Sequence, residues 1–96
     1  MGKLQDMKQQ MEDAKDKLKD MTATAEADNG RVKVIVTGDH KIKDITIADD
    51  LSGKDNKEEL QELLIVALNK AMEKADELHE QEMQGVAKFN IPGLDL

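Results

Sequence analysis

The stretch from Asp55 to Met83 constrains the fold more than any other part of the sequence, because it reads as one long helix with an unusual middle. Asp55 is placed to act as the N-cap, and Glu58 follows three residues later, which is the capping-box pattern. Apolar residues then recur with helical spacing, at Leu60, Leu64, Ala67, Leu68, Ala71, Ala75 and Leu78. Residues 63–68 are all apolar, and at about 100° per residue such a run covers the whole circumference of a helix. We therefore expect this helix to be buried on more than one side.

The size and charge of the chain limit what can bury that helix. The 96 residues fit one small domain, 1–96, with a limited core of its own. Phe89 is the sole aromatic residue, so aliphatic side chains, methionine and alanine must fill the core. The net charge is −7, and residues 56–96 carry nine acidic against four basic residues. Such an acidic balance is not the usual mark of a nucleic-acid-binding protein.

The composition also predicts where the chain works. Cysteine is absent, which fits a reducing compartment. No apolar run approaches the roughly 20 residues that span a bilayer, and the first residues lack the apolar segment of a signal peptide. We expect a cytoplasmic protein without a membrane partner.

Residues 2–20 predict a first helix that forms an arm. Its apolar residues are spaced alternately three and four apart, at Leu4, Met7, Met11, Ala14, Leu18 and Met21. This seam is narrow, so the helix should bury one edge and leave the rest in water. The methionines are far better explained by packing than by metal or redox chemistry.

Residues 21–48 predict a three-stranded antiparallel meander. Residues 22–28 and 31–37 alternate apolar with polar side chains, and Asn29-Gly30 between them favours a type I′ hairpin turn. A third strand is expected over residues 41–48. Ile42 is out of phase with Ile45 there, which predicts either a bulge near Lys43 or an isoleucine that caps the end of the sheet.

The whole chain thus predicts an α+β fold in the order helix, three-stranded meander, long helix over residues 55–84. Gly85 is expected to end that helix, and residues 85–96 form a tail whose Phe89, Ile91 and Leu94 either dock on an apolar groove or stay mobile. Both helices should overhang the short strands. A second copy is the economical cover, so we expect a homodimer. The expected interface residues lie on the long helix: Leu60, Leu63, Leu64, Val66, Ala67, Leu68 and Ala71.

The sequence contains no evident catalytic constellation. The segment from His79 to Met83 resembles a zinc-protease motif but has methionine in place of the second histidine. Asp76 and His79 could at most bind a divalent ion weakly. We expect no enzyme activity, no metal, no cofactor and no small-molecule substrate.

Basic side chains on the arm and on the second strand are the remaining candidates for function. Each is, taken singly, better explained as a solvated charge, but a dimer doubles the set. The candidate DNA-binding residues are Lys3, Lys8, Lys15, Lys17, Lys19, Arg31 and Lys33, with Lys41 and Lys43 on the third strand.

Four segments together resemble the YbaB/EbfC family of nucleoid-associated proteins. They are the Met/Gln/Lys-rich opening at residues 2–11, the G-x-V-K-V-x-V-x-G strand at residues 30–38, the helix segment at residues 63–71 with Lys74-Ala75, and Ile91-Pro92-Gly93-Leu94. The resemblance implies a tweezers-like homodimer whose first helices project as arms. It also implies DNA binding in the nucleoid, with roles in nucleoid organisation and gene regulation.

A second function class stays open. The Met-rich seam of the arm could grip a client helix, because methionine-lined surfaces adapt to varied partners. In that case the chain would be a protein–protein adaptor.

Overall fold

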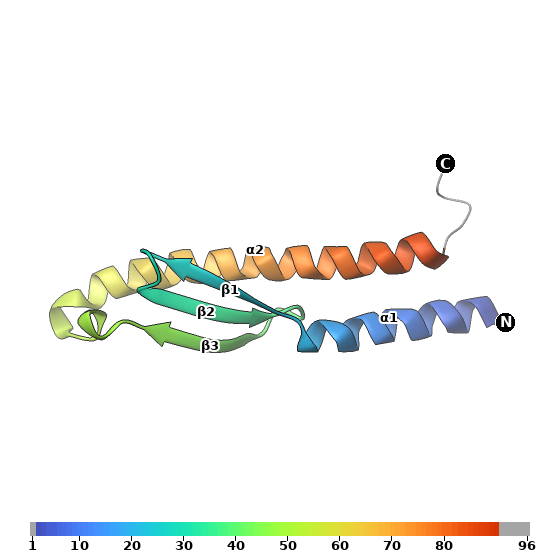
Figure 1. Cartoon of the computed structure of the whole chain (residues 1–96), viewed down its shortest axis with the longest axis horizontal. Coiled ribbons are helices and arrows are strands. Elements are labelled where there is room, and N and C mark those ends of the chain that lie inside the picture. Colours follow the sequence, from blue (N-terminus) through green and yellow to red (C-terminus); the bar gives the residue numbers. More distant parts are fainter. Residues whose placement is uncertain (1, 91–96) are drawn as a thin grey trace.

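The chain folds as helix, three-stranded antiparallel sheet and long helix, as predicted (Figure 1). The computed structural model describes the backbone of residues 2–90 and the side chains of residues 4–86. Its elements are α1 (Gly2–Asp20), β1 (Thr22–Ala27), β2 (Val32–Thr37), β3 (Ile42–Ile47), two short 3-10 turns, η1 (Asp49–Leu51) and η2 (Lys54–Asn56), and α2 (Lys57–Asn90). The molecule is elongated, with extents of 62 × 25 × 16 Å. Both helices overhang the sheet, and α1 lies beside the C-terminal half of α2 (Figure 1).

The hairpin between β1 and β2 forms at the predicted turn. Asn29 and Gly30 are its two central residues and have φ of 55° and 88°, as a type I′ turn requires. The backbone N–H of Arg31 donates to the carbonyl of Asp28 at 3.2 Å, which closes the turn. The turn sets the register in which Ala27 lies opposite Val32.

The bulge predicted in the third strand is confirmed. Ile35 pairs with Asp44 and Val36 pairs with Ile42, so Lys43 is the extra residue of β3. Because the bulge shifts the alternation by one residue, Ile42 lies on the same face of the sheet as Ile45 and Ile47. The third strand therefore has one continuous apolar face.

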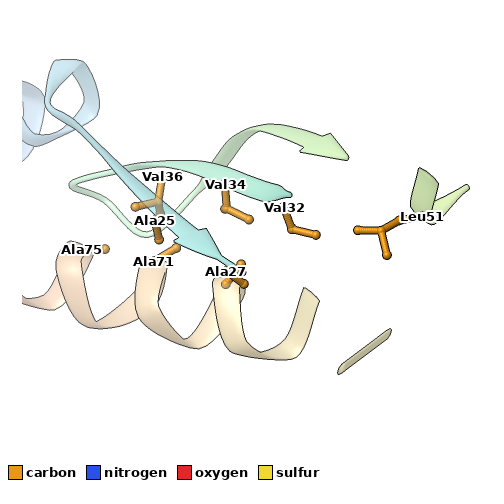
Figure 2. Packing of buried hydrophobic residues seen from close by; sticks show 9 residues of the cluster. Ala25, Ala27, Val32, Val34, Val36, Leu51, Ala71 and Ala75 are labelled. Carbon is orange, nitrogen blue, oxygen red and sulfur yellow. The ribbon is translucent and has the colours of Figure 1, made fainter. Parts of the chain in front are cut away.

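The core is a thin layer of alanine and valine between the sheet and α2 (Figure 2). Ala67, Ala71 and Ala75 form a stripe on α2 at intervals of four residues, and each is fully buried. Small side chains let the helix approach the sheet closely, where Val32, Val34 and Val36 point toward it (Figure 2). Together with Ala25, Ala27 and Leu51, these residues form one cluster.

Leu51 was not expected in the core. It lies in the connection after β3 that the sequence presents as polar, yet its side chain is fully buried. The 3-10 turn η1 aims it at the end of the alanine–valine layer, and its flanking residues Asp50 and Ser52 stay exposed. The connection thus closes one end of the core.

Two boundaries of the long helix differ from the prediction. Asp55, expected as the N-cap, lies inside η2, and α2 begins at Lys57. At the other end, the helix continues through Gly85 to Asn90, so the prediction that Gly85 ends it is wrong. An interior glycine costs a helix only about 1 kcal/mol, which its neighbours on both sides offset. The expected contacts of Phe89, Ile91 and Leu94 lie outside the described side chains.

Candidate nucleic-acid interface

The lysines of α1 divide into two groups according to the face of the helix on which they lie. Lys8, Lys15 and Lys19 are separated by seven and four residues, which places them within about 40° of one another around the helix. Their side chains are exposed. We call these three residues the lysine stripe. Lys17 lies about 200° around the helix from Lys15, so it points the other way.

The far side of α1 faces α2. Ala14 and Leu18 are buried there, and the Lys17 ammonium lies 3.2 Å from a carboxylate oxygen of Glu82 on α2. The lysine stripe therefore points away from α2. That direction matters electrostatically, because the exposed residues Glu73, Glu77 and Glu80 make α2 acidic along the face opposite its alanine stripe. The lysine stripe of α1 and the acidic face of α2 are thus separated.

Arg31, by contrast, is held by three carboxylates. Its guanidinium lies 2.5 Å from Asp28, 2.6 Å from Glu59 and 2.5 Å from Asp50. The hydrogen bonds to these groups, that to Asp28 first, raise the pKa of Arg31 above its ordinary value. The arginine ties the β1–β2 hairpin to η1 and α2, and three of its five N–H donors bond to these carboxylates.

Lys33 is also paired. Its ammonium lies 3.8 Å from the carboxylate of Glu26, the residue directly opposite it on β1. Both side chains are about half exposed on the sheet face that α2 does not cover. Lys41 and Lys43 are exposed nearby, and the side chain of Lys3 lies outside the described ones. Of the predicted cationic residues, the structure places Lys8, Lys15 and Lys19 on one face of α1 and pairs Lys17, Arg31 and Lys33 with acids of other elements. Lys19 also lies 3.5 Å from Asp16 within α1, and both side chains are exposed.

The expected dimer-interface residues fall into three groups. Ala67 and Ala71 are fully buried against the sheet of their own chain. Leu60, Leu63, Leu64 and Leu68 are half-buried beside the same core. Val66 is 43% exposed and lies on the outer side of α2.

An apolar patch between β3 and α2 was missed by sequence reasoning. Ile42 and Ile45 are exposed although they lie on the sheet face that elsewhere packs on the helix. Ile65 on α2 is 60% exposed. It lies eleven residues before Asp76 and so within about 20° of it around the helix. Because Asp76 contacts His40 in the β2–β3 turn, Ile65 is on the β3 side of α2. The bulge in β3 was the signal that could have revealed this patch.

Other chemistry is sparse. The Nε2 atom of His40 lies 2.5 Å from Asp76, and the rings of His40 and His79 are 6.0 Å apart. Among the described side chains, no three histidine or acidic residues converge as metal ligands would. Within residues 2–90, neither helix is long and apolar enough to cross a membrane.

The fold and this surface define a class of protein: a small helix–meander–helix chain whose helical arm carries a stripe of exposed lysines. The sequence model of the YbaB/EbfC DNA-binding family matches residues 1–89, and the chain belongs to that family. A nucleoid-associated protein of Flavobacterium johnsoniae is 39% identical over 98 residues, covering 99% of this chain and 91% of that protein. One of Halalkalibacterium halodurans is 42% identical, covering 80% and 76%.

A solved structure has the same fold. The crystal structure of an uncharacterized protein from Helicobacter pylori superposes with a TM-score of 0.74 at 30% identity, and covers 96% of this chain and 91% of that one. The predicted family resemblance and the predicted fold are both confirmed.

Proposed function

We propose that this protein is a nucleoid-associated protein that binds duplex DNA as a homodimer, mainly through contacts to the phosphate backbone. The family and the names of the relatives support DNA as the partner and the nucleoid as the location. The observation that carries the proposal is the lysine stripe, which points away from the acidic helix of its own chain. Roles in nucleoid organisation and gene regulation would follow from such binding.

The chemistry of the stripe favours the backbone over the bases. Lys8 and Lys15 are about 10 Å apart along the helix axis, and Lys19 follows after about 6 Å, so the three ammonium groups can reach successive phosphates. A lysine ammonium is a point charge that binds phosphate without reading sequence. Arg31, whose guanidinium could read guanine, already has three acidic partners. Binding should therefore depend strongly on salt and weakly on sequence.

A mobility shift measured against salt concentration tests this function. We expect the chain to bind DNA at low salt. The logarithm of the association constant should fall linearly with the logarithm of the salt concentration. The variant Lys8→Glu/Lys15→Glu should bind much more weakly, whereas Lys54→Glu/Lys57→Glu should bind nearly as well as the native chain. Both variants change the net charge equally, but Lys54 and Lys57 begin η2 and α2, and the start of α2 lies at the far end of the molecule from the free end of α1 (Figure 1). If both variants lost DNA affinity equally, the lysine stripe would not be the binding surface. If the native chain bound no DNA at any salt concentration, the proposed function would be wrong.

The homodimer would form on the patch of Ile42, Ile45 and Ile65. Ile42 and Ile45 form the β3 side of this patch, and Ile65 forms its α2 side. The half-buried Leu68 and Met72 also lie on the α2 side. A two-fold axis would let the same patch of a second copy cover this one. The exposed Val66 extends the apolar surface around α2. Tweezers-like arms would then project from a shared body.

A protein–protein adaptor is the second candidate. Leu4 is 77% exposed and Met11 is also exposed, and both lie on the side of α1 that borders the lysine stripe. An amphipathic client helix with acidic residues could pack there. If a pull-down recovers one stoichiometric protein after nuclease treatment, the adaptor is favoured over the DNA-binding protein.

A further inference from the structure

Lys17 and Glu82 join α1 to α2 at the border of an open cavity between the two helices. The ion pair spans 3.2 Å, and the Glu82 side chain is only 21% exposed, against 65% for that of Lys17. A shielded carboxylate attracts an ammonium group more strongly than an exposed one, because less water screens it. The pair is therefore placed to fix α1 relative to α2.

The base of α1 is firmly attached. The backbone N–H of Gly38 donates to the carbonyls of Leu18 and Met21, each at 2.9 Å. The Leu18 side chain is buried, and a Cβ added to Gly38 would lie only 2.7 Å from its Cδ2 atom. The contact between the β2–β3 turn and the end of α1 is therefore close and leaves no slack.

Beyond this base, the space between the two helices is partly open. A cavity of about 340 Å³ lies between them, lined by Ala14 and Lys17 of α1 and by Glu82, Gly85 and Val86 of α2, together with Gln10 and Asp13. A Cβ built on Gly85 would meet no atom within 4 Å. Among the described side chains, only Ala14 and Val86 are apolar ones that line this cavity, so a polar contact near the base has leverage over the whole helix.

The leverage can be estimated from the length of the helix. Residues 2–17 span about 22 Å at 1.5 Å per residue. A rotation of about 10° at the base would thus move the first residues by about 4 Å, which exceeds the 3.4 Å rise between phosphates of one strand. The angle of α1 consequently decides which phosphates Lys8 can reach.

We propose that Lys17 and Glu82 are a positioning pair that sets the angle at which the lysine stripe meets DNA. This inference rests on the proposed DNA binding. It reassigns Lys17 from a phosphate contact to a residue that acts through the orientation of Lys8, Lys15 and Lys19. To contact the same phosphates as the stripe, Lys17 would have to leave Glu82. It would also have to reach around the helix, because it lies about 200° from Lys15.

A charge swap separates the two roles of Lys17. The double variant Lys17→Glu/Glu82→Lys keeps the net charge of −7. It restores an ion pair in which α1 carries the carboxylate and α2 the ammonium group. We expect Lys17→Glu alone to weaken binding about tenfold, because the arm loses its clamp and a nearby positive charge. The double variant should return to within about twofold of native affinity. If it stays as weak as Lys17→Glu, Lys17 itself contacts phosphate and the proposal is wrong.

The orientation of the arm is measured independently of DNA. The chain has no cysteine, so spin labels at Gln5→Cys and Gln81→Cys report the distance between the helices without interference. We expect a broader distance distribution in Lys17→Glu and in Glu82→Lys, and the native distribution in the double variant. The swap Asp16→Lys/Lys19→Asp exchanges a pair within α1 and should leave the distances unchanged.

The two measurements distinguish failure of this proposal from failure of the function. Unchanged distances in both single variants would overturn the positioning role even if DNA binding is normal. Absence of DNA binding by the native chain would overturn the proposed function, and with it the role of the pair in binding, while the distances would still show whether the pair holds the arm.

Discussion

The side-chain ammonium of Lys74 lies 2.6 Å from the backbone carbonyl oxygen of Thr24, on the outer edge of strand β1. Lys70 makes the same kind of contact with the carbonyl of Glu26 at 3.3 Å. Both lysines come from α2, and they donate to carbonyls that a neighbouring strand would otherwise use. The outer edge of β1 is thereby closed to strand pairing, whereas no such contact covers β3 among the described residues.

We expect the variant Lys70→Ala/Lys74→Ala to form larger assemblies than the native chain. Removing both ammonium groups leaves the carbonyls of an edge strand free to accept hydrogen bonds from another chain. Light scattering coupled to size exclusion should show higher-mass species that grow with protein concentration.

The matched control for the edge is Lys54→Ala/Lys57→Ala, which removes the same charge without touching β1. It should keep the mass of the native chain. Identical behaviour of the two variants would show that the lysines do not protect the edge.

The features that sequence reasoning predicted are those that depend on neighbouring residues. The alternation of Val32, Val34 and Val36 set the buried face of β2, and Asn29-Gly30 set the hairpin turn. The phase of Ile42 against Ile45 predicted either a bulge or an isoleucine that caps the sheet, and the structure shows the bulge. Each is decided by backbone geometry over a few residues, so no knowledge of distant partners is needed.

The features that it missed depend on residues far apart in the chain. Nothing near Lys17 indicates that Glu82, 65 residues later, is its partner, and nothing near Arg31 indicates Glu59. Leu51 reads as part of a polar connection until η1 turns it inward. Such contacts follow from the path of the chain in three dimensions, which periodicity does not define.

The apolar patch leads to a prediction about self-association. We expect Ile45→Lys to shift the equilibrium toward the 10.7 kDa monomer, because the variant would bury a charge in the proposed interface. Ile45 is exposed in the single chain, so the fold itself should persist. Sedimentation equilibrium at micromolar concentration, with circular dichroism to monitor folding, measures both effects.

Val66→Lys is the companion variant, because Val66 is also exposed but lies on the outer side of α2. A dimer that tolerates the lysine at Val66 but not at Ile45 would place the two-fold axis on the patch between β3 and α2. Dimerisation that survives in both variants would contradict the proposed interface.

The carboxyl group of Asp39 leads to a prediction about pH. The hydrogen bond from the Thr37 hydroxyl lowers the pKa of Asp39 below its ordinary value of 3.8. A group with a lowered pKa stabilises the folded chain above its ordinary pKa, and this contribution is lost as the pH falls through the folded-state value. We therefore expect native stability to decline below about pH 4 more steeply than that of Asp39→Asn, which keeps an acceptor oxygen but does not titrate. Thermal melts from about pH 2.5 to pH 6 measure the difference, and parallel curves would contradict it.

Two glycines that lie beside α1, one in the β2–β3 turn and one on α2, should respond to alanine in opposite directions. Gly38→Ala brings a Cβ within 2.8 Å of the Leu18 carbonyl oxygen, and we expect it to destabilise the chain by about 1–3 kcal/mol through overpacking at the base of α1. Gly85→Ala adds a methyl group in open space inside α2, so the better helix propensity of alanine should stabilise the chain by about 1 kcal/mol. Chemical denaturation of both variants tests the pair. If Gly38→Ala were neutral, the contact between α1 and the β2–β3 turn would be looser than the structure describes, and the arm would not pivot from a fixed base.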